Sequence, residues 1–167
     1  MTQSPISNAV PLDGSRDRSG FDCGNEALNS YLLRYSWQNQ KNNYSRTFVM
    51  CRDLRVVGYY TLVAGSVSPA DVPQSMTRGS PKHNVPIILL ARLAVDRPEQ
   101  GQGVGKAFLK HAALSALAAA DFVGCRAMMV HAKDATAAEF YVKYGFEQSP
   151  VNALTLFMLT SDLEASL

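Results

Sequence analysis

The sequence predicts a fold of the α/β or α+β class, built on one mixed β-sheet with helices on both faces. One observation behind this is an apolar run at 87–95 that leads through a glycine-rich turn into a helical pattern at 104–120 and a second apolar run at 126–131. Strand, helix, strand in this order places two strands parallel, with a right-handed crossover. The other is a pair of strand-like runs at 47–51 and 56–68, whose short link is typical of an antiparallel hairpin.

The composition is that of a compact globular protein. Hydrophobic residues make up 47% of the 167 residues and charged residues 18%, which argues against disorder and fits a single domain over residues 1–167. No stretch offers the ~20 apolar residues of a spanning helix, so we expect no signal peptide and no membrane span. The cysteines, Cys23, Cys51 and Cys125, are far apart and form no C-x-x-C pair. We therefore expect reduced thiols, no metal site and a cytoplasmic protein.

Charge is distributed unevenly, although the net charge is only +2. Residues 34–82 carry seven Arg and Lys against two Asp, a balance of +5, and the flanking segments are slightly negative. Such a segment can attract a polyanion such as nucleic acid. An ordinary solvated surface explains the same balance, and composition leaves both interpretations open.

The upstream elements begin with a helix after a candidate N-cap at Asp22 or Asn25. Its apolar positions recur at three- and four-residue steps, at Ala27, Leu28, Tyr31, Leu32 and Tyr35. The hairpin strands follow, and then a long irregular connection at 68–86. This connection holds four prolines, Pro69, Pro73, Pro81 and Pro86. A loop of this length in a compact domain is usually functional or mobile.

The downstream elements centre on the helix at 104–120. The run 87–95 before it is typical of a strand buried on both faces, and 96–99 breaks that strand. Lys106 and Lys110 are predicted to face outward, opposite a buried stripe made of Val104, Phe108, Leu109, Ala112, Ala113, Ala116 and Leu117.

The last elements are a helix and a strand. Asp134 is predicted to cap a helix that runs through Tyr141 and ends at Gly145. The run 154–159 then closes the domain as a strand.

The glycine-rich turn at 100–105 (QGQGVG) can be compared with three phosphate-binding loops. A Walker A loop would need glycine at 100 and Ser or Thr at 107, where the chain has Gln100 and Ala107. A dinucleotide-binding G-x-G-x-x-G from Gly101 would need glycine where Lys106 stands. The pattern that fits is Q-x-x-G-x-G, matched by Gln100, Gly103 and Gly105.

This turn has the chemistry of a pyrophosphate site. Gly103 and Gly105 let the backbone approach a bulky anion, because no Cβ stands in the way. The amides at the start of the helix lack intrahelical partners and would make charge-assisted hydrogen bonds of roughly 1.5–3 kcal/mol each. The alternative is a merely tight strand-to-helix turn, but three glycines at a helix start cost stability by propensity.

A second motif follows at 138–146 (AEFYVKYGF). Together, Q-x-x-G-x-G and F-Y-x-K-x-G-F resemble the hallmarks of the GNAT superfamily of N-acetyltransferases. The resemblance covers residues 87–146 and implies the GNAT fold, a mostly antiparallel sheet with a parallel central pair. It also implies direct transfer of an acetyl group from acetyl-CoA in a ternary complex.

Three upstream segments resemble, more narrowly, the GNAT toxins of bacterial type II toxin–antitoxin pairs. They are 20–29 (GFDCGNEALN), 57–62 (VGYYTL) and 90–96 (LARLAVD), in the order of that subfamily's signatures. This implies acetylation of the α-amino group of an aminoacyl-tRNA, which blocks translation. It also implies a homodimer and a small antitoxin, typically ribbon-helix-helix.

The resemblance assigns roles to individual residues. The pantetheine arm would bind the strand end and the pyrophosphate the loop, with further contacts from the tyrosine helix, where Asp134 stands in place of the family's frequent asparagine. These acetyl-CoA contacts are Leu93, Ala94, Val95, Gln100, Gly101, Gln102, Gly103, Val104, Gly105, Lys106, Asp134 and Phe140. Tyr141 would donate a proton to the departing thiolate, since a phenol near pKa ~10 and a thiol near ~8.5 are close enough for transfer. The alternative for Tyr141 is a packed aromatic beside Phe140 and Tyr144.

The acceptor side offers no general base, because His83, His111 and His131 are scattered. An α-amino group near pKa ~8 is partly neutral without one, so such a site suits an aminoacyl ester better than a lysine near ~10.4. Arg92, alone in an apolar strand, must be paired if it is buried. It either holds a carboxylate or meets the acceptor end of tRNA, and Asn25 is the other candidate substrate contact.

Two other functions stay open at this point. One is a GNAT enzyme for a small amine, a polyamine or a protein N-terminus. The other is a non-catalytic acyl-CoA-binding regulatory module. Contacts to tRNA would weaken steeply with salt, whereas binding of a small amine would not.

Overall fold

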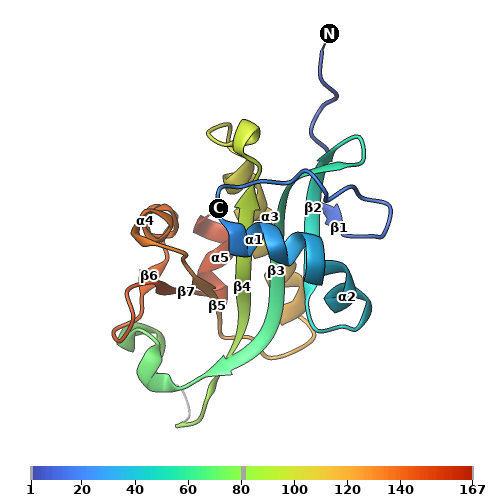
Figure 1. Ribbon diagram of the computed structural model, residues 1–167. Helices are drawn as coiled ribbons and strands as arrows, with labels where there is room; N and C mark the ends of the chain where they lie inside the picture. Colours follow the sequence, from blue (N-terminus) through green and yellow to red (C-terminus); the bar gives the residue numbers. More distant parts are fainter. Residues whose placement is uncertain (1, 80–81, 167) are drawn as a thin grey trace. The chain divides into compact units, whose positions relative to one another are not determined.

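The computed structural model describes residues 2–79 and 82–166 (Figure 1). The chain falls into two compact units. The first unit runs up to Val63 and includes Ala91–His111; the second comprises Ala64–Leu90 and the residues from Ala112 onward. The single domain expected over residues 1–167 stays a prediction, and one calorimetric unfolding transition would test it.

The seven strands follow the hydrogen-bonding order β1-β2-β3-β4-β5-β7-β6. Strands β4 (Val85–Val95) and β5 (Ala127–His131) are parallel, and helix α3 (Val104–Ala120) connects them. Antiparallel pairs join β1 to β2, β2 to β3, β5 to β7 and β6 to β7. The predicted mixed sheet, with its parallel pair away from the edges, is confirmed.

In the first unit, β1 (Val10–Pro11) pairs with β2 (Arg46–Arg52), and β2 pairs with β3 (Arg55–Val67). The predicted hairpin is confirmed, and its turn is shorter than expected. Arg52 pairs with Arg55, so only two residues turn the chain, the first of them Asp53 with a φ of 53°. Aspartate tolerates this left-handed conformation better than most residues.

The helical segment that begins after Asn25 is interrupted. Helix α1 (Glu26–Ser30) passes into a π-helical turn at Tyr31–Tyr35 and then into α2 (Ser36–Lys41). The Asn25 side chain accepts from the Leu28 amide, which settles the N-cap in favour of Asn25. The single regular helix predicted here is wrong at its middle. A π-turn takes in an extra residue and shifts the phase of the side chains, and Tyr35 ends up 54% exposed instead of inward.

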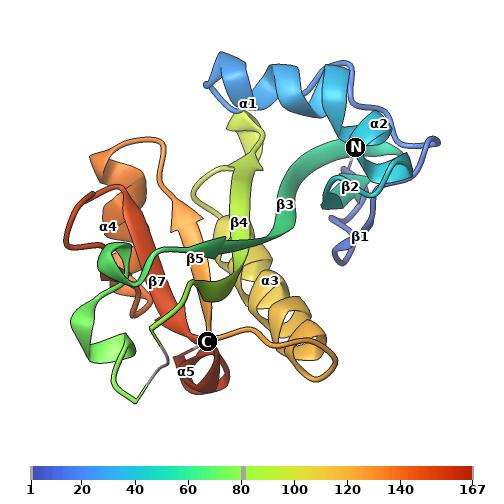
Figure 2. The same ribbon diagram turned by 90° about the horizontal axis from the view of Figure 1, so that it is seen from below.

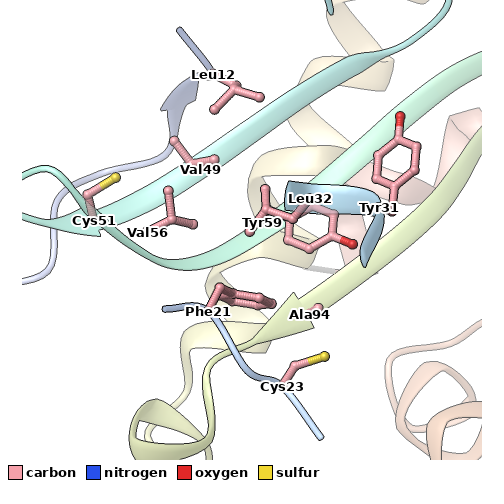
Figure 3. Close-up of a cluster of buried hydrophobic side chains, with 10 residues drawn as sticks. All are labelled: Leu12, Phe21, Cys23, Tyr31, Leu32, Val49, Cys51, Val56, Tyr59 and Ala94. Carbon is pink, nitrogen blue, oxygen red and sulfur yellow. The ribbon is translucent and has the colours of Figure 1, made fainter. Parts of the chain in front are cut away.

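The first unit has a core of its own, drawn in Figure 3. Side chains from the N-terminal segment, the helical segment and three strands meet in it: Leu12, Phe21, Cys23, Tyr31, Leu32, Val49, Cys51, Val56, Tyr59 and Ala94. Its aromatic members contact one another, because the rings of Tyr31 and Tyr59 stack and Phe21 meets Tyr59 edge-on. Contacts between aromatic rings therefore form the centre of this core.

In the second unit, β5 and β7 (Thr155–Leu159) run side by side, as Figure 2 shows. Helix α4 (Ala135–Lys143) and strand β6 (Glu147–Gln148) precede β7, and helix α5 (Thr160–Ser166) follows it. A second core forms here from Val72, Met76, Val85, Ile87, Ala127, Met129 and Phe157.

The connection between β3 and β4 is partly built into that second core. It contains two 3₁₀ turns, Pro69–Asp71 and Gln74–Met76, and Met76 is 5% exposed. The Arg126 guanidinium donates to the Met76 carbonyl at 3.0 and 3.3 Å. Pro81 of the predicted loop lies outside the described residues.

Candidate active site

The predicted pyrophosphate loop follows β4 through a 3₁₀ turn at Arg97–Glu99. Gly101 and Gly103 have φ values of 79° and 83°, a region that favours glycine, and α3 begins directly after them. A Cβ at either position would meet no atom within 4 Å. Glycine is therefore required here by the backbone and not by neighbouring side chains, and the space beside the loop stays open. The sequence motif pointed to Gly103 and Gly105 as the glycines of the turn, whereas the left-handed conformations belong to Gly101 and Gly103.

Helix α3 presents the start that an anion site needs. Its first amides have no acceptor within the helix, and its first closing bond runs from the Ala107 amide to the Gly103 carbonyl at 3.1 Å. The first turn contains no acidic residue. Nothing in that turn opposes the positive end of the helix dipole.

The two glutamines of the loop use their side chains to fix its shape. The Gln100 side-chain amide donates to the carbonyls of Val95 at 2.8 Å and Cys23 at 3.0 Å. That of Gln102 donates to the Pro98 carbonyl at 3.2 Å. Any contact of these two residues with a pyrophosphate therefore falls to their backbone amides.

Two buried carboxylates precede the loop, and each is neutralised by an arginine of the β2–β3 hairpin. Glu99, 2% exposed, pairs with Arg52 through two hydrogen bonds of 3.0 and 2.9 Å. These bonds from Arg52 lower the pKa of Glu99. Asp96 pairs with Arg55 at 3.1 Å. The balance of +5 over residues 34–82 thus overstates the free positive charge, because Arg52 and Arg55 are already paired.

The segment before α1 is tied to the same loop. The Asp22 amide donates to the Asp96 carboxylate at 2.9 Å, and the Arg97 amide donates to the Asp22 carbonyl at 2.9 Å. Gly24 has a φ of 91°, and a Cβ there would lie 3.4 Å from the Arg97 guanidinium. Residues 21–24 (FDCG) therefore help to hold the predicted pyrophosphate loop in place. The side-chain oxygen of Asn25 accepts the hydrogen bond that caps α1. The role of Asn25 as a substrate contact stays a prediction.

Arg92 lies half-buried on β4, with its guanidinium carbon 3.5 Å from the centre of the Tyr31 ring. Within residues 2–79 and 82–166 it makes no hydrogen bond and no ion pair. The interpretation that Arg92 holds a carboxylate of the fold is therefore wrong for the described part of the chain. The face of the Tyr31 ring takes the place of a carboxylate, because it attracts the positive charge of Arg92 without a hydrogen bond from the guanidinium N–H groups. Sequence patterning cannot reveal this partner, which is far away in the chain.

Tyr141, in the second unit, lies on α4. Asp134 caps this helix by accepting from the Ala137 amide at 2.8 Å, and Gly145 ends it with a φ of 99°, both as predicted. Tyr141 is 7% exposed and meets the rings of Phe140 and Phe146 edge-on, at 5.2 and 5.6 Å. The predicted second ring neighbour, Tyr144, instead meets Phe140.

The Tyr141 hydroxyl makes no hydrogen bond to any residue that the structure describes. Burial raises the pKa of this phenol, because it disfavours the phenolate. The phenol is therefore a weaker acid here than in water; it carries its proton at neutral pH and can donate a hydrogen bond to a ligand.

Each of the three histidines has a hydrogen-bond partner within the protein. Ring nitrogens lie 2.5 Å from the Tyr60 hydroxyl for His111, 3.1 Å from the Thr155 hydroxyl for His131 and 3.0 Å from the Asn84 carbonyl for His83. Burial lowers the pKa of His111. Among the described residues, no three or more His, Cys, Asp or Glu side chains are grouped as a metal site would require. Over the same ranges, no helix combines the length and the apolar character needed to cross a membrane.

Comparison with known proteins agrees with this geometry. Residues 43–148 match the family model described as the acetyltransferase (GNAT) domain. A tRNA-acetylating toxin of Mycobacterium tuberculosis is 46% identical over 154 residues, which cover 92% of each chain.

Two solved structures of the toxin AtaT are also similar. AtaT in complex with acetyl-methionyl-tRNAfMet has a TM-score of 0.89 and 33% identity, covering 96% of this chain and 98% of that one. A Tyr-to-Phe mutant of AtaT, bound to the C-terminus of the antitoxin AtaR and to acetyl-CoA, has a TM-score of 0.83 and 32% identity, covering 97% of each chain. Loop, helix start, tyrosine helix and these likenesses together show that the chain belongs to the GNAT family of acetyltransferases.

Proposed function

We propose that this protein is a toxin that transfers the acetyl group of acetyl-CoA to the α-amino group of an aminoacyl-tRNA and thereby blocks translation. The observation that carries this proposal is the likeness, over 92% of both chains, to a toxin named for acetylating tRNA. The complexes of AtaT with acetyl-methionyl-tRNAfMet and with acetyl-CoA support the same acceptor and donor.

The donor is held by backbone more than by side chains. The pyrophosphate of acetyl-CoA binds the amides of Gly101–Lys106, since the Gln100 and Gln102 side chains are already engaged. The backbone of Leu93–Val95 binds the pantetheine arm and orients the thioester. Asp134 and Phe140 complete the donor contacts from the tyrosine helix; the Asp134 carboxylate also caps that helix.

Tyr141 supplies the proton that the leaving sulfur needs. The neutral amine attacks the thioester carbonyl, a C–N bond forms, and the C–S bond breaks. The sulfur takes the phenolic proton, and the proton released by the nitrogen restores the phenol. No separate base is needed, because an α-amino group near pKa ~8 is partly neutral at pH 7.

Arg92 faces the acceptor. A guanidinium presents several in-plane N–H donors, which suit phosphate oxygens better than the point charge of a lysine does. We place Asn25 at the same side of the reaction as a second contact. The remaining basic residues of 34–82, with Arg52 and Arg55 set aside, attract the tRNA at longer range.

The biological setting follows from the same family. We propose a cytoplasmic homodimer that is inhibited by a ribbon-helix-helix antitoxin, as AtaT is bound by AtaR. A short gene of that class directly upstream would support this, and size-exclusion chromatography with light scattering would test the dimer.

The decisive experiment incubates the purified protein with labelled acetyl-CoA and bulk charged tRNA. We expect label on charged tRNA and none on uncharged tRNA. Tyr141→Phe should lower kcat by roughly 10²-fold or more, the usual contribution of a general acid. Tyr44→Phe is the matched control, because Tyr44 is 73% exposed.

Three other outcomes separate the alternatives. Label on small amines or protein N-termini alone would favour a different GNAT acceptor. Binding of acetyl-CoA without any transfer would favour the regulatory module. Undiminished transfer by Tyr141→Phe would remove Tyr141 from the mechanism.

A further inference from the structure

The π-helical turn at Tyr31–Tyr35 is built into the fold by side chains outside it. The Ser36 amide reaches back five residues to the Tyr31 carbonyl, so the carbonyls in between need other donors. Arg18 donates to the carbonyls of Leu32 at 3.1 Å and Leu33 at 3.3 Å, and the buried Ser36 hydroxyl donates to Leu32 at 2.6 Å. The carbonyls of Leu32 and Leu33 thus have donors from side chains. Turns of this kind occur frequently at functional sites.

Tyr31, the first residue of the turn, is held at its hydroxyl and at its ring. Its hydroxyl lies 2.9 Å from the Ser45 hydroxyl and accepts from the Asn39 side-chain amide at 3.2 Å. The ring is 7% exposed and stacks with Tyr59, at 6.4 Å and 19° between planes. Tyr59 is fixed in turn, because its hydroxyl donates to the Leu28 carbonyl at 2.6 Å. Figure 3 shows Tyr31 and Tyr59 within this core.

Arg92 packs its guanidinium against this fixed ring, at 3.5 Å from the ring centre. A Cζ atom only 3.5 Å from the ring centre fits a guanidinium that lies flat on the ring, with its N–H groups directed outward. Those N–H groups have no hydrogen-bond or ion-pair partner among the described residues. Burial raises the pKa of Tyr59 and the charge of Arg92 acts the other way, in keeping with a cation next to this aromatic pair. A guanidinium that is fixed by stacking and has unpaired N–H groups is well placed to bind an oxyanion such as phosphate.

From this geometry we propose that Tyr31 is a positioning residue for Arg92. It holds the guanidinium so that the N–H edge binds a phosphate of the single-stranded acceptor end of the RNA. This rests on the proposed function, because it assigns the residues that select that acceptor. Tyr31 itself does not touch the acceptor; it acts through Arg92.

The test is a double-mutant cycle of Tyr31→Leu and Arg92→Gln, with Tyr31→Phe as the conservative variant. Tyr31→Leu should raise the KM for charged tRNA roughly 3- to 10-fold, the range of a partly desolvated cation–π contact, and leave the KM for acetyl-CoA unchanged. Tyr31→Phe keeps the ring and should stay within about 2-fold of the wild type. In the Arg92→Gln background, Tyr31→Leu should add nothing further.

Salt dependence gives a second readout that does not need catalysis. Fluorescence anisotropy with a labelled single-stranded RNA ending in CCA should show a slope of log affinity against log salt that is reduced by about 0.7 in Arg92→Gln, the value of one phosphate contact to a single strand. Thermal unfolding of every variant reports any loss of structure. If the wild type binds this RNA but acetylates no charged tRNA, the proposed function is wrong. The double-mutant cycle is then evaluated from the dissociation constants for the RNA instead of from KM.

Three results would overturn the inference. Additive effects of Tyr31→Leu and Arg92→Gln would show that the two residues act separately. A defect in Tyr31→Phe equal to that in Tyr31→Leu would assign the role to the hydroxyl. If the dependence of RNA affinity on salt is unchanged in Arg92→Gln, Arg92 does not contact a phosphate of the RNA.

Discussion

Gly58 of β3 lies where α3 packs on the sheet, and Gly58→Ala is expected to destabilise the protein. A Cβ there would lie 2.4 Å from Cε2 of Phe108 and 3.3 Å from the Ala94 carbonyl oxygen. The Phe108 ring is fully buried and meets Tyr60 edge-on, so it has little room to retreat. Overpacking of this kind costs about 1–3 kcal/mol, and alanine recovers about 0.5–1 kcal/mol over glycine within a strand.

The difference between these two effects is about 0–2.5 kcal/mol, and the upper half of that range is expected because the Phe108 ring cannot retreat. A net loss of about 1–2.5 kcal/mol corresponds to a fall in Tm of roughly 2–10 °C for a chain of this size. The affinity for acetyl-CoA should fall as well, because Phe108 can move only with α3, whose first turn forms the proposed anion site. Thermal unfolding followed by circular dichroism gives the first quantity and titration calorimetry the second.

The matched control is Gly65→Ala on the same strand. Gly65 is exposed, and its added Cβ would meet only the flexible end of Ile87, at 3.3 Å. This variant should keep the wild-type Tm or exceed it slightly. Gly58→Ala with Phe108→Leu should lose less than the sum of the two single changes, because the smaller side chain frees space. If Gly58→Ala unfolds at the same temperature as Gly65→Ala, the packing argument is refuted.

Two further predictions concern charge and capping. Arg52 lowers the pKa of Glu99, so the stability that this pair contributes is present above the unfolded value of about 4.3 and is lost as the pH falls through the lower folded value. Glu99→Gln should therefore unfold more easily in urea at pH 7 yet lose less stability than the wild type below about pH 4; parallel curves for both proteins would contradict this. Asp134→Ala should cost about 1 kcal/mol by removing the cap of α4, whereas Asp134→Asn should keep both the stability and the KM for acetyl-CoA. A raised KM for acetyl-CoA in Asp134→Asn would show that the donor contact proposed for Asp134 needs the negative charge of its carboxylate.

Local signals were sufficient to predict much of the fold. The bounds of α3, the parallel strands around it, the cap at Asp134 and the stop at Gly145 all depend on residues close together in the chain. The short strands β1 and β6 could not be predicted, because two residues are too few to show the alternation of apolar and polar residues typical of a strand. The π-helical turn could not be predicted either. It is stabilised by hydrogen bonds from the Arg18 and Ser36 side chains, and the residues of the turn itself show no distinctive pattern.

The sequence by itself determined the family of this protein. It also singled out the proposed acetyl-CoA loop at 100–105 and the proposed proton donor Tyr141, because each lies in a contiguous motif whose backbone conformation or chemistry needs those residue types. Only the tertiary structure decided which charges are free. Arg52 and Arg55 counted as surface charge until their pairing with Glu99 and Asp96 appeared, and Arg92 lacked a partner until the Tyr31 ring was seen against it. Ion pairing and stacking depend on distance in space between residues dozens of positions apart, and no local pattern encodes that distance.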